Sequence, residues 1–292
     1  MSEKTTILLF GPTNSGKTAQ IGVLAEHIFR TTGKKTRLYT GDRGGTKTIA
    51  PHIKLGIVEP IEIQGTDPWL FLNKAAKGQV RDAAGKWVPG DFSNIGMVAF
   101  ESFRSFAEEL LMWQAEKAGE GINIGGGSNV SFVVSAEGEN LKIGGGNVTH
   151  YKVAQDRMTA EIWRSQKLPV DVVLWTTSVN KDEGLLNIGK VLGPDVIGKA
   201  LTEETPRWFT FTFHIAVLPA AAGKAERHLL YLGTHQDASS GNATALGNIR
   251  QPLDAPKLAE IVIEPADIVK ALAAIEGGLD PAVEAIRKRC KL

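Results

Sequence analysis

The chain has 292 residues, 42% of them hydrophobic and 22% charged, and its formal net charge is +1. These values are typical of a globular protein with a sizeable core, and they exclude a global positive field that would draw the molecule onto nucleic acid or an anionic membrane. A single cysteine, Cys290, excludes a disulfide framework or a cysteine-based zinc site within one chain. No segment is long and apolar enough to span a bilayer, and the N-terminus does not resemble a signal peptide, so we expect a cytoplasmic protein.

The first predicted elements enclose a phosphate-binding motif. Residues 5–10 (TTILLF) form an apolar run typical of a buried strand, and residues 18–30 carry apolar side chains at helical spacing. The eight residues at their junction fit the P-loop pattern G-x-x-x-x-G-K-[ST], namely Gly11, Pro12, Thr13, Asn14, Ser15, Gly16, Lys17 and Thr18. A strand before the motif and a helix after it are the context that separates a P-loop from a chance glycine-rich turn.

The composition of this loop predicts a site for ATP. Gly11 and Gly16 let backbone N–H groups turn toward an anion, and the helix N-terminus adds a favourable dipole. Lys17 is expected to reach the β- and γ-phosphates, and Thr18 to offer its hydroxyl to Mg²⁺. All eight residues are therefore expected to bind the nucleotide.

Strands and helices alternate along the rest of the chain. Strand patterns occupy residues 35–40, 57–63, 95–100, 170–176, 208–217 and 228–232, and helical patterns occupy residues 68–77, 103–117 and 149–167. Residues 80–88 are typical of a small hairpin, and the polar, small-residue stretch 236–247 is typical of a loop. The alternation predicts an α/β fold with a mostly parallel central sheet flanked by helices.

Two regions depart from this alternation. Glycine-rich stretches on either side of a strand candidate at residues 130–134 indicate a long hairpin, an insertion at 119–147. Near the C-terminus, helical patterns at 266–275 and 281–289 are separated by two glycines. We therefore expect one domain over residues 1–263 and a small helical appendage over residues 264–292.

Polar residues at the ends of predicted strands are candidates for catalysis. Glu101 follows the strand at 95–100, where an acid is needed to position Mg²⁺; the usual residue is aspartate, and the alternative is an ordinary acid at a helix N-terminus. Asp42 follows the strand at 35–40 and could orient or deprotonate the attacking water; the alternative is a turn aspartate beside glycines. Thr176, Thr177 and Ser178 close the strand at 170–176, where a polar residue could sense the γ-phosphate, although β-propensity also explains the threonines. Thr177 is the residue of the three that we expect to bind the nucleotide.

Together these elements resemble the phage-encoded RecA-like ATPases, the AAA-type phage nucleotide-binding proteins that include Sak-type recombination ATPases. The matching stretches are the P-loop, TGDRGG at 40–45, IGMVAFES at 95–102, LPVDVVLWTTSVNKDE at 168–183 and GPDVIGKA at 193–200. The similarity covers most of residues 5–252, and the GPDVIGKA segment points to this group in particular. The resemblance implies a RecA-like core, ATP hydrolysis and action on DNA, with Asp42 as the catalytic acid and Glu101 as the metal acid. The insertion at 119–147 departs from the compact pattern of the family.

We therefore expect an ATPase with Lys17, Asp42 and Glu101 as catalytic residues and with Thr18 and Glu101 at Mg²⁺. Its expected role is phage recombination or replication in the host cytoplasm, with single-stranded DNA as a partner. The insertion is expected to contact DNA or a neighbouring subunit, and the alternative is a surface insertion with no role. Two alternatives stay open. One is a non-catalytic nucleotide-binding assembly or structural phage protein. The other is a P-loop kinase of a small molecule, which usually carries an arginine-rich lid that no central loop of this sequence provides.

A homo-oligomer is also expected, because RecA-like sites often lie between subunits. A basic residue from a neighbour would then complete the charge stabilisation of the transferred phosphoryl group. Arg250 is the first candidate for this trans arginine, and Arg207 and Arg227 are weaker ones. The alternative for each of them is an ordinary surface arginine.

Overall fold

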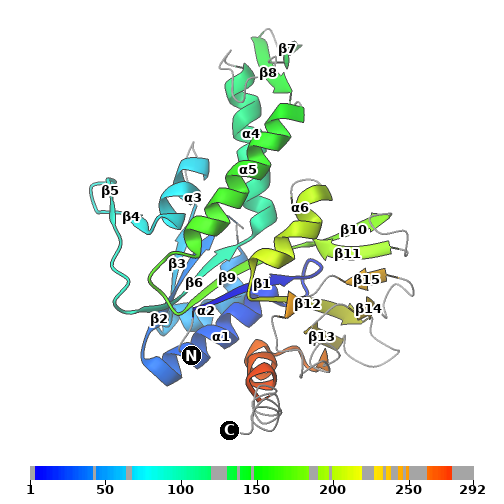
Figure 1. Cartoon of the computed structure of the whole chain (residues 1–292). Coiled ribbons are helices and arrows are strands. Elements are labelled where there is room, and N and C mark those ends of the chain that lie inside the picture. Colours follow the sequence, from blue (N-terminus) through cyan, green and yellow to red (C-terminus); the bar gives the residue numbers. More distant parts are fainter. Residues whose placement is uncertain are drawn as a thin grey trace, which may run out of the picture.

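A nine-stranded sheet forms the centre of the protein (Figure 1). The computed structural model describes residues 4–41, 44–63, 68–119, 130–136, 139–145, 148–183, 190–196, 199–218, 227–232, 235–237, 243–245, 248–249 and 262–277. The strand order is β17 (Val262–Ile263), β13 (Arg227–Tyr231), β12 (Phe211–Leu218), β1 (Thr5–Phe10), β9 (Val172–Thr177), β6 (Ile95–Glu101), β2 (Lys35–Thr40) and β3 (Val58–Glu62), and β16 (Asn248–Ile249) pairs with β12. Every neighbouring pair from β12 to β3 is parallel, whereas β13, β16 and β17 are antiparallel to their neighbours. The predicted mostly parallel sheet is confirmed.

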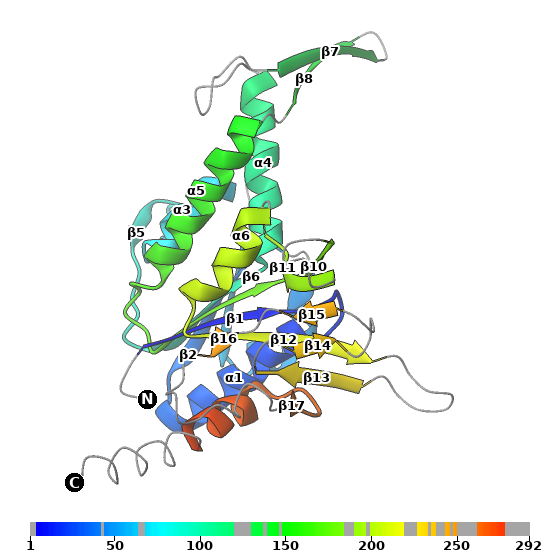
Figure 2. The same ribbon diagram turned by 45° about the vertical axis from the view of Figure 1, so that its right-hand side comes forward.

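Helices cover both faces of this sheet (Figure 2). One face carries α1 (Lys17–Thr32) and the helix of residues 268–277, and the other carries α3 (Pro68–Ala76), α4 (Phe103–Gly119) and α5 (Val148–Ser165). Strands β1, β6 and β9 are buried along their whole length. Because both faces of these strands are covered, their sequences are continuous apolar runs rather than alternating patterns.

Side chains of the central strands alternate between two apolar cores. In β9, Trp175 lies on the α4 side, where its ring stacks on Phe100 with centroids 4.4 Å apart and meets Phe106 edge-on. The adjacent Leu174 belongs to the core on the α1 side. The indole N–H of Trp175 donates to Oγ of Ser165 (3.0 Å), at the end of α5. These contacts fix α4 and α5 over the middle of the sheet.

α4 and α5 pack against each other and extend well beyond the sheet. At their far end lies the antiparallel hairpin of β7 (Val130–Ala136) and β8 (Glu139–Gly145) (Figures 1 and 2). This hairpin falls within the insertion predicted at 119–147 and contains the strand predicted at 130–134, whereas residues 120–129 lie outside the described part of the chain.

A second, smaller sheet begins directly after β9. It contains β10 (Val179–Glu183), β11 (Lys190–Pro194), β15 (Ala243–Ala245) and β14 (His235–Asp237), and α6 (Lys199–Glu204) follows β11. β15 and most of β14 fall in the stretch 236–247, so the prediction of a loop is wrong for these residues. Their small and polar side chains carry no apolar alternation, and their conformation follows from strand pairing: β15 pairs with β11, and β14 pairs with β15.

Short elements complete the fold. The hairpin predicted at 80–88 is confirmed as β4 (Gln79–Arg81) and β5 (Trp87–Pro89). One-turn helices η1 (Gly45–Ile49) and α2 (Ala50–Lys54) follow β2, and η2 (Thr205–Trp208) follows α6. None of the helices in the described ranges combines the length and apolar character needed to cross a bilayer.

The helix predicted at 266–275 is present at residues 268–277. Its side chains Ile268, Leu272 and Ile275 belong to the core on the α1 side of the sheet. The second predicted helix, at 281–289, lies outside the described residues, and the domain boundary after residue 263 stays a prediction.

Candidate nucleotide site

A cavity of about 670 Å³ opens at the carboxyl ends of β1, β6 and β9, within the size range of small-molecule sites. It is lined by residues 13–19, by Gly44, Gly45 and Thr48 after β2, by Glu101, Ser102, Arg104 and Ser105 at the junction of β6 and α4, and by Thr176 and Ser178 at the end of β9. Parallel strands bring their carboxyl ends to one edge of the sheet, which is where α/β proteins bind ligands. The sequence motif and the cavity therefore coincide.

The backbone of the P-loop is held in the conformation that its glycines permit. Gly16 and Asn14 have positive φ angles of 93° and 63°. A Cβ atom at Gly11 would lie 2.5 Å from the carbonyl oxygen of Ile215 in β12, so only glycine fits between the loop and that strand. Nδ1 of His228, in β13, donates to the carbonyl oxygen of Ser15 (2.9 Å) and ties the loop to the antiparallel side of the sheet.

Lys17 begins α1 and folds back over the P-loop. Its ammonium group donates to the carbonyl oxygens of Gly11 (2.9 Å) and Pro12 (2.7 Å). These carbonyls are neutral acceptors, whereas a phosphate is an anionic one that forms stronger hydrogen bonds with an ammonium group. Lys17 is therefore positioned to transfer its hydrogen bonds to a phosphate that enters the cavity.

Thr18 and Glu101 meet inside the cavity. The hydroxyl of Thr18 donates to Oε1 of Glu101, whose side chain is only 3% exposed. Mg²⁺ is usually held by one or two carboxylates together with substrate phosphates, and hydroxyl oxygens are suitable hard ligands. The pair thus fits the metal role predicted for both residues. Among the residues with described positions, no group of three or more His, Cys, Asp and Glu side chains forms a separate metal cluster.

The backbone places the start of the Asp42 loop beside Glu101. Thr40 is in register with Glu101, and the N–H of Gly41 donates to the carbonyl oxygen of Glu101 (2.8 Å). Asp42 itself lies outside the described residues, so its catalytic role stays a prediction. Arg250 also lies outside them. Arg207 is exposed in η2 and does not line the cavity, and Arg227 is the first residue of β13, so the role of each as a trans arginine stays a prediction.

At the end of β9, the threonine that enters the cavity lining is Thr176 rather than Thr177. Thr177 is buried, and its hydroxyl donates to the carbonyl oxygen of Asp195 (2.5 Å), so its predicted contact with nucleotide stays a prediction. Oγ1 of Thr176 is buried against the cavity and has no hydrogen-bond partner within the described residues. Ser178 also lines the cavity. Strand periodicity alone does not distinguish these neighbours, because it does not tell which face of the strand end borders a ligand.

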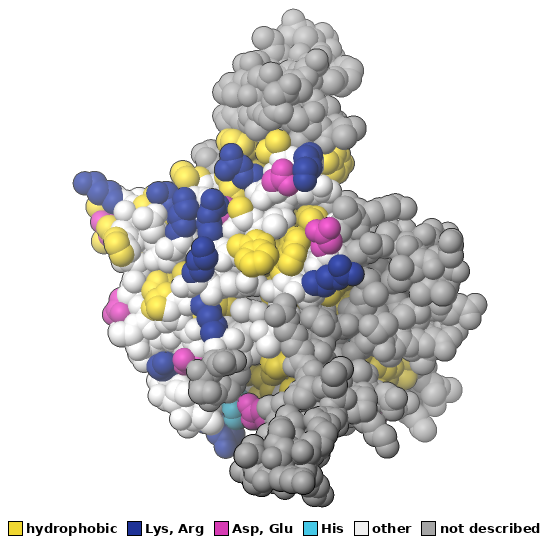
Figure 3. Space-filling model, in the orientation of Figure 1, with side chains coloured by type: hydrophobic (Ala, Val, Ile, Leu, Met, Phe, Trp, Pro, Cys, Tyr) yellow, Lys and Arg dark blue, Asp and Glu magenta, His cyan; other side chains and the backbone are white. Residues whose placement is uncertain are grey.

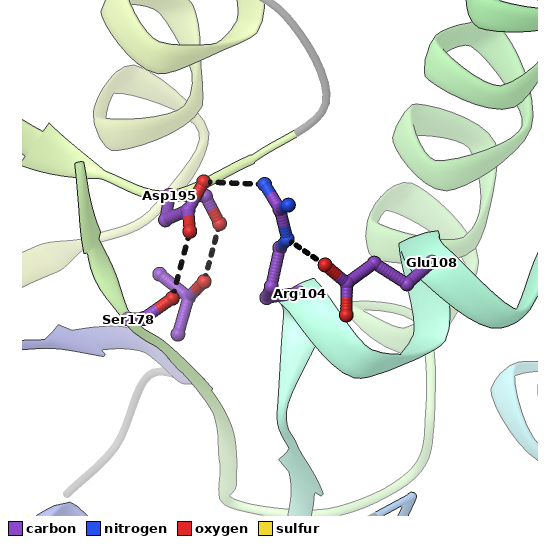
Figure 4. A network of polar contacts seen from close by, with 5 residues as sticks. Arg104, Glu108, Ser178 and Asp195 are labelled. Atoms are coloured by element: carbon purple, nitrogen blue, oxygen red, sulfur yellow. Dashed lines mark hydrogen bonds and ion pairs between the residues drawn. The ribbon is translucent and has the colours of Figure 1, made fainter. Parts of the chain in front are cut away.

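Arg104 is the charged residue of the cavity lining that the sequence analysis did not name (Figure 4). Its Nε donates to Glu108 Oε1 (2.6 Å), and its Nη1 donates to Asp195 Oδ1 (2.8 Å). Burial lowers the pKa of Arg104, but the hydrogen bonds and charges of Glu108 and Asp195 outweigh it and raise the pKa overall, so the guanidinium stays charged. Lys17 and Arg104 are the cations that line the cavity among the described residues. The i, i+4 spacing of Arg104 and Glu108 in the sequence indicates an ion pair between them, whereas nothing in the sequence indicates the contact of Arg104 with Asp195.

Comparison with known proteins assigns the chain to no family. The chain matches no known protein-family model and no curated protein. A similar solved structure is that of a KaiC-like protein from the hyperthermophilic archaeon Pyrococcus horikoshii OT3, with 12% sequence identity and a TM-score of 0.42 over 79% of this chain and 78% of that one. The fold class of the chain rests on its own strand order and on the position of its P-loop.

Proposed function

We propose that this protein is an ATPase of RecA-like architecture that binds ATP with Mg²⁺ and hydrolyses it. The observation that carries the proposal is the contact between the Thr18 hydroxyl and the Glu101 carboxylate inside the cavity that the P-loop lines. A P-loop by itself accounts for phosphate binding. A hydroxyl and a carboxylate paired beside it add the ligands that metal-assisted phosphoryl transfer requires.

Each group of the site has a defined part in the proposed reaction. Backbone N–H groups of the P-loop surround the phosphates, and Lys17 exchanges its two loop carbonyls for phosphate oxygens. Thr18 and Glu101 would hold Mg²⁺, which neutralises charge on the transferred phosphoryl group. Asp42, one residue beyond the Gly41–Glu101 hydrogen bond, would orient the attacking water and accept its proton.

Phosphate release from ATP by the full chain tests this proposal. We expect Mg²⁺-dependent release by the wild type and a loss of about a hundredfold or more in Lys17→Ala, the range measured for removing a group that stabilises a transition-state charge. Lys54→Ala, an exposed lysine change on α2, is the matched control. Wild-type turnover by a folded Lys17→Ala protein would remove the P-loop from the mechanism.

The proposal extends to DNA handling in phage recombination or replication, in the host cytoplasm and as a homo-oligomer. The sequence resemblance supports this extension, and so do the basic side chains on the face formed by α3 and α5. Lys77, Arg164 and Lys167 line a second cavity of about 350 Å³ at the seam of α3 and α5, and Arg157 lies 5.9 Å from the ring centroid of Trp69. Figure 3 shows Lys and Arg side chains in a column over this region. Positive charge beside aromatic rings is what single-stranded DNA surfaces combine.

A second candidate function is nucleotide-dependent assembly without turnover. Glu101 favours it, because the usual acid at this position is aspartate and the extra methylene moves the carboxylate relative to the metal. Phosphate release with and without single-stranded DNA separates these functions. Stimulation by DNA supports the DNA-coupled ATPase, and tight ATP binding without release supports the assembly protein. Transfer only to a small acceptor supports the kinase alternative.

A further inference from the structure

Arg104 divides its charge between two carboxylates at the edge of the candidate nucleotide site. It is the second residue of α4 and is 42% exposed, while the Asp195 side chain that it contacts is 20% exposed. Glu108, the other partner, lies one turn farther along the same helix, so that pair is local. The pair with Asp195 is not local, because it joins α4 to the segment that follows β11, 91 residues later in the chain.

Asp195 is anchored to the strand end that also borders the cavity (Figure 4). Its Oδ2 accepts a hydrogen bond from the Ser178 hydroxyl (3.0 Å), and its N–H donates to the Ser178 carbonyl oxygen (2.8 Å). Its own carbonyl oxygen accepts from the Thr177 hydroxyl (2.5 Å). Arg104 and Ser178 both line the phosphate cavity, so the Arg104–Asp195 pair stands at its wall.

We propose that Arg104 detects the terminal phosphate of a bound nucleoside triphosphate by exchanging Asp195 for it. The inference rests on the proposed nucleotide site and adds a triphosphate-selective residue to it. A γ-phosphate carries more negative charge than a carboxylate, so it competes for the guanidinium and repels the Asp195 carboxylate at the same time. A diphosphate ends one phosphate earlier and leaves the ion pair intact.

The exchange has a direct route to the second sheet. Asp195 follows β11, and β11 pairs with β10, which continues from β9. In the observed state, Arg104 ties this segment to α4. Release of the Asp195 carboxylate leaves its N–H bond to the Ser178 carbonyl and its carbonyl bond to the Thr177 hydroxyl in place, but removes the tie to α4. The described segment 190–196 and α6 after it would then report whether a triphosphate is bound.

Equilibrium binding of the full chain to AMP-PNP and to ADP, both with Mg²⁺, tests the inference. Arg104→Gln is expected to weaken AMP-PNP binding by about tenfold or more, the effect of one hydrogen bond to a charged group, and to change ADP binding by less than about twofold. Asp195→Asn removes the competing charge but keeps the side-chain shape, so we expect tighter AMP-PNP binding and unchanged ADP binding. Arg30→Gln on α1, whose side chain is 77% exposed and pairs with Glu26, is the matched control and should change neither affinity.

The opposite signs of the two variants make the test independent of a folding defect. If Arg104→Gln fails to fold, Arg104→Lys, which keeps the charge but loses the planar fork, should still lower the AMP-PNP to ADP affinity ratio. The inference would be overturned if the Arg104 variants weaken the binding of AMP-PNP and ADP equally, or if Asp195→Asn binds AMP-PNP more weakly than the wild type. Hydrogen exchange over residues 190–204 should be faster with AMP-PNP than with ADP in the wild type and equal in Arg104→Gln.

The outcomes also separate this inference from the proposed function. If the wild type binds both nucleotides and the Arg104 variants keep its AMP-PNP to ADP affinity ratio, the phosphate-sensing role is rejected and the proposed nucleotide site is retained. A folded wild type that binds neither nucleotide rejects both.

Discussion

At the scale of single residues, the two acids beside the P-loop have separable roles. The carboxylate of Glu101 accepts a hydrogen bond from the Thr18 hydroxyl. Asp42 follows Gly41, whose N–H donates to the carbonyl oxygen of Glu101. If Glu101 holds Mg²⁺, Glu101→Gln should raise the Mg²⁺ concentration needed for half-maximal phosphate release. If Asp42 activates water, Asp42→Asn should slow turnover about a hundredfold or more while ATP affinity is kept.

Titration of Mg²⁺ at saturating ATP, together with equilibrium ATP binding, distinguishes the two variants. Exchanged phenotypes would reverse the assignment, with Asp42 at the metal and Glu101 at the water. If both variants turn over ATP like the wild type, neither acid serves the reaction. Glu26→Gln on the exposed face of α1 provides a control for the loss of one carboxylate.

The P-loop and Glu101 could be recognised from sequence because each is defined by its position next to an apolar strand. The loop pattern is local, and Glu101 ends β6, directly after the apolar run of that strand. Arg104 and Asp195 lacked such a signal, since their contact depends on how β10 and β11 turn back from β9. Asp195 belongs to the GPDVIGKA segment that carried the family resemblance, but the sequence did not indicate its partner.

At the scale of elements, the central strands and the long helices were predictable, and the second sheet was not. β1 occurs at the predicted residues because a buried parallel strand is a continuous apolar or β-branched run. β2 also occurs at the predicted residues, although Lys35 and Arg37 interrupt its buried side chains. β14 and β15 have three residues each and mostly small or polar side chains. Such strands form because tertiary pairing overrides weak local propensity.

The seam between α3 and α5 gives an element-scale prediction about pH. Glu161 in α5 has no exposed side-chain surface, accepts a hydrogen bond from Asn73 Nδ2 in α3 (2.8 Å) and pairs with Arg164. Burial raises the pKa of Glu161 above its ordinary value of 4.5, and the bonds from Asn73 and Arg164 oppose this only in part. Between the unfolded and the folded pKa, the folded protein keeps a proton that the unfolded chain has lost. The contribution to stability is therefore full below pH 4.5 and is lost as pH rises through the folded pKa.

Glu161→Gln should flatten this part of the pH dependence, because glutamine does not titrate. Urea unfolding at a series of pH values between about 4 and 8 measures the slope, which the linkage relation connects to proton release. Thr31→Ala, at an exposed position on α1 whose side chain does not titrate, should keep the wild-type slope. An identical slope in Glu161→Gln and the wild type would show that this carboxyl does not titrate abnormally in the folded state.

At the scale of the whole molecule, assembly is the first open question. Arg250 is predicted to reach the site of a neighbouring subunit, where its charge would stabilise the transferred phosphoryl group. Arg250→Ala should then lower turnover without weakening ATP binding. Mixing it with Lys17→Ala should restore part of the activity, because a mixed interface can combine an intact Lys17 with an intact Arg250. Specific activity that does not depend on protein concentration, with a monomer in ATP by light scattering, would contradict a shared site.

The second question at this scale is which surface meets DNA. The β7–β8 hairpin lies at the far end of α4 and α5, whereas the basic column lies over the seam of α3 and α5, nearer the sheet (Figures 1 and 3). Replacing residues 120–147 by a short glycine–serine linker should leave basal ATPase activity intact and reduce DNA stimulation if the insertion binds DNA. If the column binds DNA instead, Lys77→Gln with Lys167→Gln should weaken single-stranded DNA binding and lower the salt slope by about 0.7 for each phosphate that is no longer neutralised.

Fluorescence anisotropy with labelled oligothymidylate at several salt concentrations compares the two variants directly. Lys54→Gln with Lys270→Gln removes two exposed lysines elsewhere and should leave both affinity and salt slope unchanged. An effect confined to the insertion variant would assign DNA to the hairpin and leave the column as a solvated face. An effect confined to the lysine pair would do the reverse. Because the net charge of the chain is only +1, binding that neither variant weakens would place the DNA site on another local basic patch of the chain. A folded wild type that binds no oligothymidylate would reject the DNA-coupled function in favour of nucleotide-dependent assembly.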